Sequence, residues 1–187
     1  PDLWGHYGFA RELATILKRP LKDYPSEFVW PGNSSEYSLE LDGQQFAHCY
    51  QLAELSIGKG PQPSPGWMQK RLLAVGQRIV SDVVDVSNYV MLELGQPTHA
   101  FDKAKVSGKQ LSVRPANEKE CFVALDESSC ELVASDFVIA DSDQAIALAG
   151  VMGGANSEVC TETTSILLES ASFEATAVRR SALQHNL

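Results

Sequence analysis

The side chains best suited to chemistry lie between Asn88 and Asp102, in the segment NYVMLELGQPTHAFD. Within it, His99 and Asp102 follow a glycine and a proline, residues that end helices and fix loops. An imidazole beside a carboxylate can orient a water molecule or accept a proton. A hydrogen-bonded structural pair explains the same two residues, and from the residues alone it is the favoured interpretation. No serine or cysteine elbow accompanies them, so acyl-enzyme chemistry has little support.

A run of small residues from Ala147 to Gly154, with the sequence ALAGVMGG, is a second candidate binding segment. Where side chains are small, the backbone can approach a ligand closely, and its N–H groups can bind a carbonyl or a phosphate. The run is neither a dinucleotide-binding fingerprint nor a P-loop, since no Lys-Ser or Lys-Thr pair follows it. A tight turn between two packed strands is the alternative.

Glu169 is the third candidate because it directly follows an apolar strand, Ile166 to Leu168. A carboxylate at the end of a buried strand has to be paired or has to face a polar pocket, because an unpaired buried charge costs several kcal/mol. An ion pair with an arginine such as Arg114 is the structural alternative to a binding role.

The composition is that of a folded domain with an excess of acidic residues. The chain has 187 residues, of which 44% are hydrophobic and 21% charged, and its net charge is −9. This charge disfavours binding of nucleic acid along a broad basic stripe, although a short RNA end needs only a local group of donors. No apolar run reaches the roughly 20 residues of a membrane-spanning helix. Four widely spaced cysteines suit neither a zinc site nor a redox dithiol, which predicts reduced thiols in a cytoplasmic protein.

Four helices are predicted from capping residues and helical spacing of apolar side chains. Ser64 and Ser87 are the predicted caps of the second and third helices, and Asp2 is that of the first. Residues 22–35, rich in Pro, Gly, Asn and Ser, are typical of a linker. The predicted helices span residues 2–18, 65–75, 88–94 and about 175–185.

Strands are predicted to outnumber helices. Tyr37 to Leu41 and Phe46 to Ile57, joined by an Asp42-Gly43 turn, are typical of a β-hairpin. Further strands are predicted at residues 111–114, 122–125, 137–140, 145–149 and 166–168. The expected fold class is therefore α+β, with mixed or antiparallel sheets and flanking helices.

Five segments, in this order, resemble the beta subunit of bacterial phenylalanyl-tRNA synthetase: GHYGFARELA, PSPGWMQKRL, GQRIVSDVVDVSNYVMLELGQPTHAFD, ALAGVMGGANSEV and ILLESASF. Together they extend from the first helix to the last, and a string as long as DVSNYVMLELGQPTHAFD is highly specific. The departures are few. Ser81-Asp82 stands where the family usually has Asn-Asn, Ser87 replaces a threonine, and Asn186 replaces a glycine.

The resemblance implies the editing module of that subunit, an α+β unit formed by its paired third and fourth domains. Residues 1–36 would be a lead-in helix and linker at the tail of the preceding domain. Residues 37–187 would be the tRNA-binding editing module, truncated at its C-terminal end. The module would hydrolyse tyrosine misattached to phenylalanine tRNA. The alternative, from another class, is a non-catalytic tRNA-binding or subunit-packing scaffold of the synthetase.

The resemblance also implies which residues form the site. His99 and Asn88 would be the catalytic residues, near the scissile ester. The residues that would bind the tyrosyl group are Glu169, Ala149, Gly150 and Pro97. Among these, Glu169 would accept a hydrogen bond from the tyrosine hydroxyl, because phenylalanine would leave a buried acceptor unsatisfied.

No cofactor and no metal are implied for editing. ATP and magnesium would serve the parent enzyme, mainly at its alpha subunit. The implied partners are the 3′ end of phenylalanine tRNA, the tyrosine of the mischarged tRNA, and the alpha subunit of the parent heterotetramer. No membrane partner is expected.

Overall fold

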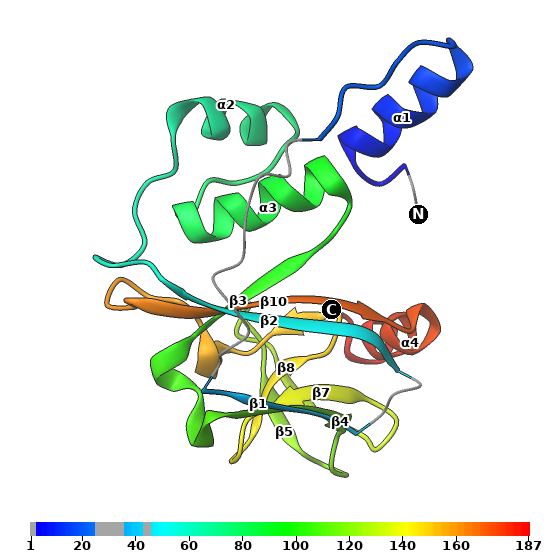
Figure 1. Cartoon of the computed structure of the whole chain (residues 1–187). Helices are drawn as coiled ribbons and strands as arrows, with labels where there is room; N and C mark the ends of the chain where they lie inside the picture. The colour runs from blue at the N-terminus through cyan, green and yellow to red at the C-terminus, as the bar shows by residue number, and fades with distance from the viewer. Residues whose placement is uncertain (1–2, 25–35, 43–45) are drawn as a thin grey trace. The chain divides into compact units, whose positions relative to one another are not determined.

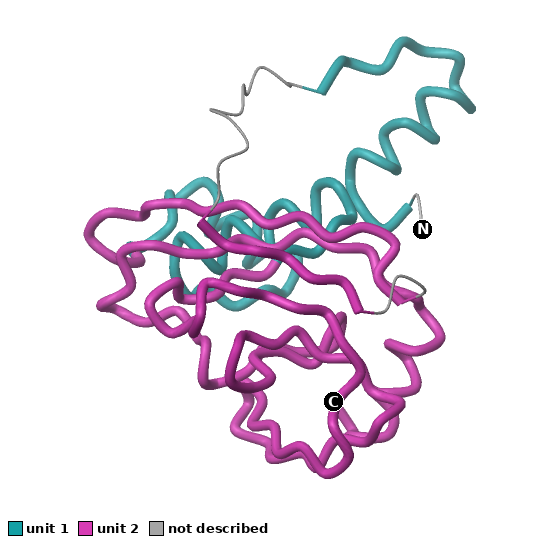
Figure 2. The backbone as a smooth tube through the Cα atoms, turned by 60° about the horizontal axis from the view of Figure 1, so that its bottom comes forward, with its two compact units in different colours: residues 1–34, 62–98 teal, residues 35–61, 99–187 magenta. Residues whose placement is uncertain are grey.

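The computed structural model of the chain describes residues 3–24, 36–42 and 46–187. The chain divides into two compact units, each built from two separate stretches (Figure 2). Residues 1–34 and 62–98 form the first, here called the helical unit, and residues 35–61 and 99–187 form the second, the sheet unit. The units interleave along the chain. The ranges 1–36 and 37–187 within the parent subunit stay a prediction.

The helical unit contains α1 (His6–Ile16), α2 (Gly66–Ala74) and α3 (Asp82–Leu94). Both α1 and α2 contact α3. Gly5, just before α1, lies so close to the end of α3 that a β-carbon there would be 2.6 Å from the Gly95 nitrogen. Gly95 has a φ of 79°, which confirms the predicted glycine stop of α3. The predicted cap Asp2 lies outside the described residues.

Two predicted helix caps in this unit are wrong. Helix α3 begins at Asp82, so Ser87 lies inside it and donates a hydrogen bond to the Thr98 carbonyl oxygen at 2.7 Å. Acidic residues in the first turn favour this earlier start. The Ser64 hydroxyl makes no cap bond to α2 and donates instead to Asp85 Oδ2 at 2.5 Å. The buried Asp85 carboxylate needs this donor more than the solvated helix end does.

The sheet unit contains a five-stranded sheet in the order β1-β4-β7-β8-β9 and a three-stranded sheet in the order β2-β10-β3. A small β5-β6 pair completes it. The strand β1 is parallel to β4, whereas β4, β7, β8 and β9 follow one another in antiparallel pairs. The strands are β1 (Ser38–Leu41), β2 (Ala47–Ser56), β3 (Thr98–Asp102), β4 (Gln110–Pro115), β5 (Cys121–Val123), β6 (Ser129–Glu131), β7 (Phe137–Ala140), β8 (Ala145–Leu148), β9 (Met152–Gly153) and β10 (Ser165–Phe173). The final helix, α4, spans Ala175–His185, as predicted.

The predicted hairpin of β1 and β2 is wrong. Strand β1 pairs with β4 in one sheet, and β2 pairs with β10 in the other. Pairing with these distant strands gives both β1 and β2 an apolar neighbour, for example Leu39 opposite Leu111. Strand β3 was also missed, because its polar residues are typical of a loop. In the structure it is hydrogen-bonded to β10.

The main core lies between the two larger sheets, which are stacked as layers in Figure 1. Side chains from both sheets, from α4 and from the segments between the strands meet there, and several are completely buried. The fully buried members are Phe101, Leu111, Val113, Ile146 and Leu167. A second cluster around Phe122 and Leu132 covers the other face of β7 and β8. The architecture confirms the predicted α+β class with mixed and antiparallel sheets.

Candidate functional site

Glu169 lies on the central strand of the three-stranded sheet, on the face that also carries the core residue Leu167. It is 6% exposed, and its Oε2 atom has no hydrogen-bond partner in the part of the chain that the structure describes. Burial raises the pKa of the Glu169 carboxyl to about 8, and the neighbouring Tyr50 hydroxyl opposes part of that rise. At neutral pH the group is therefore mostly an uncharged carboxylic acid in an apolar environment.

Tyr50 is the neighbour of Glu169 on strand β2. It pairs with Ala171, two residues beyond Glu169, so the two side chains lie diagonally on the same face. Tyr50 is 8% exposed, and within residues 3–24, 36–42 and 46–187 its Oη atom also has no hydrogen-bond partner. Burial, followed by the nearby Glu169 carboxyl, raises the Tyr50 pKa well above its usual value. Sequence patterns do not indicate this pair, because the predicted hairpin places β2 away from β10.

His99 lies on β3, at the edge of the same sheet, on the same face as Phe101. The two rings meet edge to face at 4.6 Å between centroids. A β-carbon on Gly153 would lie only 2.5 Å from His99 Cε1, so the imidazole can pack against strand β9 only because residue 153 is a glycine. Burial lowers the His99 pKa to about 4. The ring is therefore neutral at pH 7, and one nitrogen can accept a proton or a hydrogen bond.

The predicted structural pair of His99 and Asp102 is not present. Asp102 Oδ2 accepts a hydrogen bond from Thr163 Oγ1 at 2.7 Å, and its Oδ1 accepts one from the Ala104 nitrogen at 3.0 Å. Residues three apart on a strand point to opposite faces, which separates the imidazole from this carboxylate. Among the described residues, the His99 ring makes no hydrogen bond. Its nitrogens are thus available to a water molecule or a substrate.

Ala149 and Gly150 form a tight turn between β8 and β9, as the structural alternative for this run predicted. The Val151 nitrogen donates to the Leu148 oxygen at 3.0 Å across the turn. Gly150 has a φ of 73°, and a β-carbon there would lie 2.8 Å from Val178 Cγ2 and 3.0 Å from the Phe173 ring. Both the backbone and the space therefore require glycine. Phe173 in turn lies 6.4 Å from Tyr50 between ring centroids.

The sheet unit thus brings four of the six predicted site residues onto one layered core. Glu169 and His99 lie on the core-facing side of adjacent strands, and the Ala149–Gly150 turn approaches this core through Phe173. Asn88, inside α3, and Pro97, after it, belong to the helical unit. The structural alternative for Glu169, an ion pair with Arg114, is not present, because Arg114 binds Glu120 through two hydrogen bonds of 2.9 and 2.8 Å.

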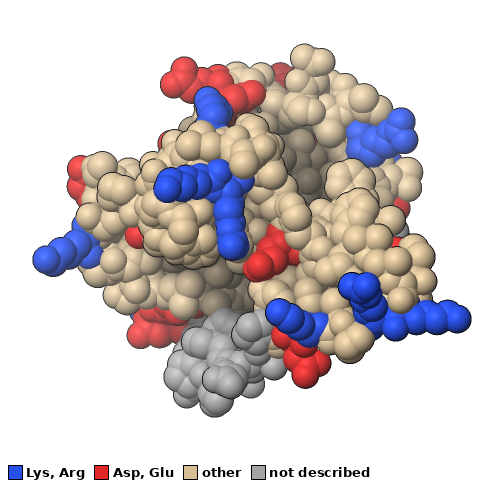
Figure 3. All heavy atoms as spheres, turned by 90° about the horizontal axis from the view of Figure 1, so that it is seen from above, with Lys and Arg blue, Asp and Glu red and all other residues tan. Residues whose placement is uncertain are grey.

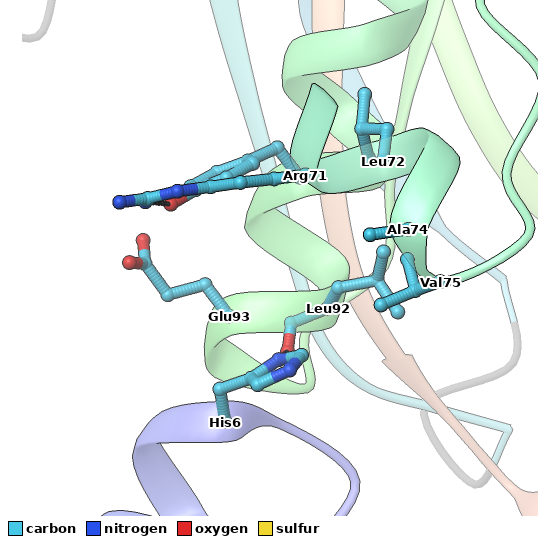
Figure 4. A pocket seen from close by; sticks show the side chains of 8 residues that line it. His6, Arg71, Leu72, Ala74, Val75, Leu92 and Glu93 are labelled. Atoms are coloured by element: carbon cyan, nitrogen blue, oxygen red, sulfur yellow. Dashed lines mark hydrogen bonds between the residues drawn. The ribbon is translucent and has the colours of Figure 1, made fainter. Parts of the chain in front are cut away.

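The helical unit has a cavity of its own, of about 400 Å³ (Figure 4). The Arg71 and Glu93 side chains point toward one another across it, above an apolar floor. The polar groups around it have protein partners. Arg71 donates to the Tyr89 hydroxyl at 2.5 Å, and His6 Nδ1 lies 2.8 Å from the Leu92 oxygen. This cavity therefore lacks the unsatisfied polar atoms that distinguish Glu169 and Tyr50.

Basic side chains on the face shown in Figure 3 stand in small groups, with acidic side chains close to several of them. Within residues 3–24, 36–42 and 46–187, no cluster of His, Cys, Asp or Glu has the arrangement of a metal site. No helix in that part of the chain is long and apolar enough to cross a membrane. All four cysteines are free thiols.

A protein-family model described as the B3/4 domain matches residues 50–187, which contain most of the chain and the whole Tyr50–Glu169 region. The chain belongs to the B3/4 domain family. Within this B3/4 chain, the match begins at Tyr50 and ends after α4, so both compact units contribute to it.

Curated relatives of this B3/4 chain carry the name phenylalanine–tRNA ligase beta subunit, which is a ligase subunit. The protein from Solibacter usitatus is 43% identical over 97% of the chain, and the one from Rhodopirellula baltica is 44% identical over 97%. The aligned part is 24% and 27% of the length of these relatives. The chain therefore spans about a quarter of each.

Among solved structures, an N-terminal fragment of the phenylalanyl-tRNA synthetase beta subunit from Pyrococcus horikoshii has a similar fold. The TM-score is 0.56 at 15% identity, over 99% of this chain and 58% of the other. At this identity the likeness shows the fold alone, and it agrees with the α+β architecture described above.

Proposed function

We propose that this chain acts within a phenylalanine–tRNA ligase beta subunit as an editing module, which hydrolyses the ester that links misattached tyrosine to phenylalanine tRNA. The observation that carries the proposal is the buried, unpartnered Glu169 on the core face of the three-stranded sheet. A hydroxyl group is the ligand chemistry that such an acceptor lacks. The names and identities of the curated relatives support the parent enzyme.

Recognition of a hydroxyl explains how one enzyme can discard tyrosine and keep phenylalanine. A synthetic pocket shaped for phenylalanine rejects the larger analogue only weakly, whereas a site with buried polar groups strongly rejects an analogue that leaves them unpaired. Phenylalanine at Glu169 would place a ring C–H against a carboxyl group and satisfy nothing. Selectivity for tyrosine then follows from the cost of leaving the polar atom unpaired.

Hydrolysis itself requires little machinery, because the aminoacyl ester is already reactive. Water adds to the carbonyl carbon, the bond to the ribose oxygen breaks, and the products are free tyrosine and a free ribose hydroxyl. His99 would hold the attacking water with an unprotonated ring nitrogen. With a pKa of about 4, His99 is a weak base, so orientation of the water is its main contribution. No metal takes part in this scheme.

A deacylation assay tests the proposal directly. The chain is incubated with tyrosyl-tRNA specific for phenylalanine, and loss of the ester is compared with the uncatalysed rate. His99→Ala should slow hydrolysis by about tenfold to a hundredfold, which is below the ~10²–10⁴-fold contribution of a true general base. Ser142→Ala, an exposed change in the same unit, is the matched control. Hydrolysis no faster than the background, by the chain and by a synthetase that contains it, would favour the scaffold alternative.

A further inference from the structure

The cavity of the helical unit is lined by two opposite charges that do not neutralise each other. The Arg71 and Glu93 side chains point toward one another there, yet neither forms an ion pair within residues 3–24, 36–42 and 46–187 (Figure 4). Arg71 makes one hydrogen bond, to the Tyr89 hydroxyl, and Glu93 accepts one at Oε2, from the Tyr24 hydroxyl at 2.8 Å. The other guanidinium N–H groups and Oε1 of Glu93 are therefore available to a ligand.

Aromatic side chains hold both charged groups in place. The Arg71 guanidinium lies 5.2 Å from the centroid of the Trp67 ring and 5.9 Å from that of Tyr89. These two rings meet edge to face at 5.4 Å between centroids. The Tyr24 hydroxyl fixes Glu93 through its hydrogen bond. A ligand thus finds the two charges already oriented, which lowers the entropy cost of binding.

The floor of the cavity is apolar and partly open to solvent. It is formed by the end of α2 and by one face of α3, and Val75 at the end of α2 is 47% exposed. The volume of about 400 Å³ lies within the roughly 300–1,000 Å³ of small-molecule sites. An apolar group of a ligand would remove this surface from water. The apolar lining residues are Leu72, Ala74, Val75 and Leu92.

We propose that this cavity binds a free α-amino acid with an apolar side chain. Its carboxylate accepts hydrogen bonds from Arg71, its ammonium group donates to Glu93, and its side chain covers the apolar floor. Both charges of an α-amino acid are attached to one carbon atom, which suits two anchors that point toward one another without forming an ion pair. The site lies in the helical unit and does not depend on the editing function proposed for the sheet unit.

The pair of charges disfavours other classes of small ligand. A phosphate group would gain from Arg71 and be repelled by Glu93, and a polyamine would meet the reverse. A neutral apolar molecule would cover the floor and leave both charges to water alone. A zwitterion with an apolar group satisfies the two charges and the floor together.

Titration of the chain with leucine, followed by NMR, tests the site. Leucine should bind with a dissociation constant on the order of 1 mM, because both charged groups are open to solvent. Isocaproate lacks the ammonium group and isoamylamine lacks the carboxylate. Each should bind about tenfold more weakly than leucine, the effect of one hydrogen bond to a charged group. The amide signals of Val75 and Leu92 should shift together as leucine is added.

Two variants connect each charge to its partner on the ligand. Arg71→Gln should weaken leucine binding about tenfold and should not weaken binding of isoamylamine, which has no carboxylate. Glu93→Gln should weaken leucine and isoamylamine alike and should not weaken isocaproate. Arg78→Gln, at an exposed arginine of the same unit that does not line the cavity, is the matched control and should keep the wild-type affinities.

The outcomes decide this proposal whether or not the chain hydrolyses tyrosyl-tRNA. The expected order of ligands, lost as described in the two variants, supports an amino-acid site in the helical unit. A leucine affinity no higher than that of isoamylamine or isocaproate overturns it, and so does a leucine affinity that survives either substitution. Failure of leucine to saturate the Val75 and Leu92 signals, or shifts confined to the sheet unit, also overturns it.

Discussion

Two buried carboxyl groups of the sheet unit, Asp136 and Glu169, have opposite environments. Asp136 is completely buried, yet it accepts from Ser181 at 2.6 Å, from the Val133 nitrogen at 3.1 Å and contacts His185 Nε2 at 2.7 Å. Burial alone would raise its pKa, but the hydrogen bonds from Ser181 and His185 hold it below the usual value. Glu169 is nearly as buried and has the opposite shift.

The difference indicates two uses of a buried carboxylate. The Asp136 cluster ties helix α4 to the turn before β7, and every bond it makes is internal to the fold. Glu169 stabilises no neighbouring element in this way, and its burial opposes folding. A residue whose burial is costly and uncompensated within the chain is a candidate for binding something outside it.

Removal of the Asp136 carboxylate should have the largest effect on stability. Asp136→Ala leaves Ser181 and His185 buried without their acceptor, and we expect the free energy of unfolding to fall by ~3–5 kcal/mol. Asp136→Asn keeps one acceptor oxygen and should cost less. Urea denaturation of the wild type, the two Asp136 variants and Glu169→Ala measures this. If the free energy of unfolding fell no more in Asp136→Ala than in Glu169→Ala, the contrast between the two carboxyl groups would be contradicted.

Replacement of Glu169 by glutamine should change how stability depends on pH. The folded pKa of about 8 lies above the ordinary value of 4.5, so the folded chain keeps a proton that the unfolded chain releases. The contribution of this retained proton to the free energy of unfolding is complete below pH 4.5. Between pH 4.5 and about pH 8 it falls by up to ~1.4 kcal/mol per pH unit. Glu169→Gln should lack that decline and exceed the wild type in stability at pH 8.

Thermal unfolding from pH 5 to pH 9 gives the measurement. The lowered His99 pKa of about 4 makes the folded chain less stable as the pH falls below 6.5, which is opposite to the effect of Glu169. Only the difference between variant and wild type therefore isolates Glu169. Glu131→Gln, at an exposed glutamate of β6, should follow the wild-type curve. Parallel curves for Glu169→Gln and the wild type would mean that Glu169 is charged and paired in the folded chain.

Removal of the Thr163 hydroxyl should have the smallest effect. Thr163→Val removes one donor from the buried Asp102, which retains the Ala104 nitrogen, and it also removes the acceptor of the Cys160 nitrogen; we expect a loss of ~1–2 kcal/mol. Thr164→Val, exposed and next in sequence, is the control. If Thr163→Val changed deacylation selectivity without changing stability, Asp102 would have a role in binding, as proposed for Glu169, and not a structural role like that of Asp136.

Local signals predicted much of this fold, whereas strand pairing was beyond them. Helix α4 begins and ends where its pattern indicates, and Asn186 has the left-handed φ of 56° expected after it. Apolar runs located β7 and β8 because fully buried strands have few polar residues. The pairing of β2 with β10 joins segments more than a hundred residues apart, and no turn chemistry encodes it.

The same division between local signals and strand pairing applies to the candidate site. Glu169 was predictable as a carboxyl group that needed a reason to be buried, because its apolar neighbours are adjacent in sequence. Tyr50 was not predictable, since it meets Glu169 only through the β2-β10 register. The polar residues around His99 predict a loop, whereas the structure has a strand there and the imidazole faces the core.

The ratio of deacylation rates for tyrosyl-tRNA and phenylalanyl-tRNA, measured for wild type and Glu169→Ala in a synthetase that contains this chain, tests the central claim most directly. The account predicts that the wild-type preference for the tyrosyl ester falls by roughly 10- to 100-fold in the variant, since leaving a buried polar group unsatisfied costs ~1–3 kcal/mol. Cleavage of the phenylalanyl ester should become faster relative to that of the tyrosyl ester, because removal of the carboxyl group also removes the penalty on an unsubstituted ring. An unchanged ratio, with both rates lowered equally, would contradict the claim that Glu169 recognises the tyrosine hydroxyl.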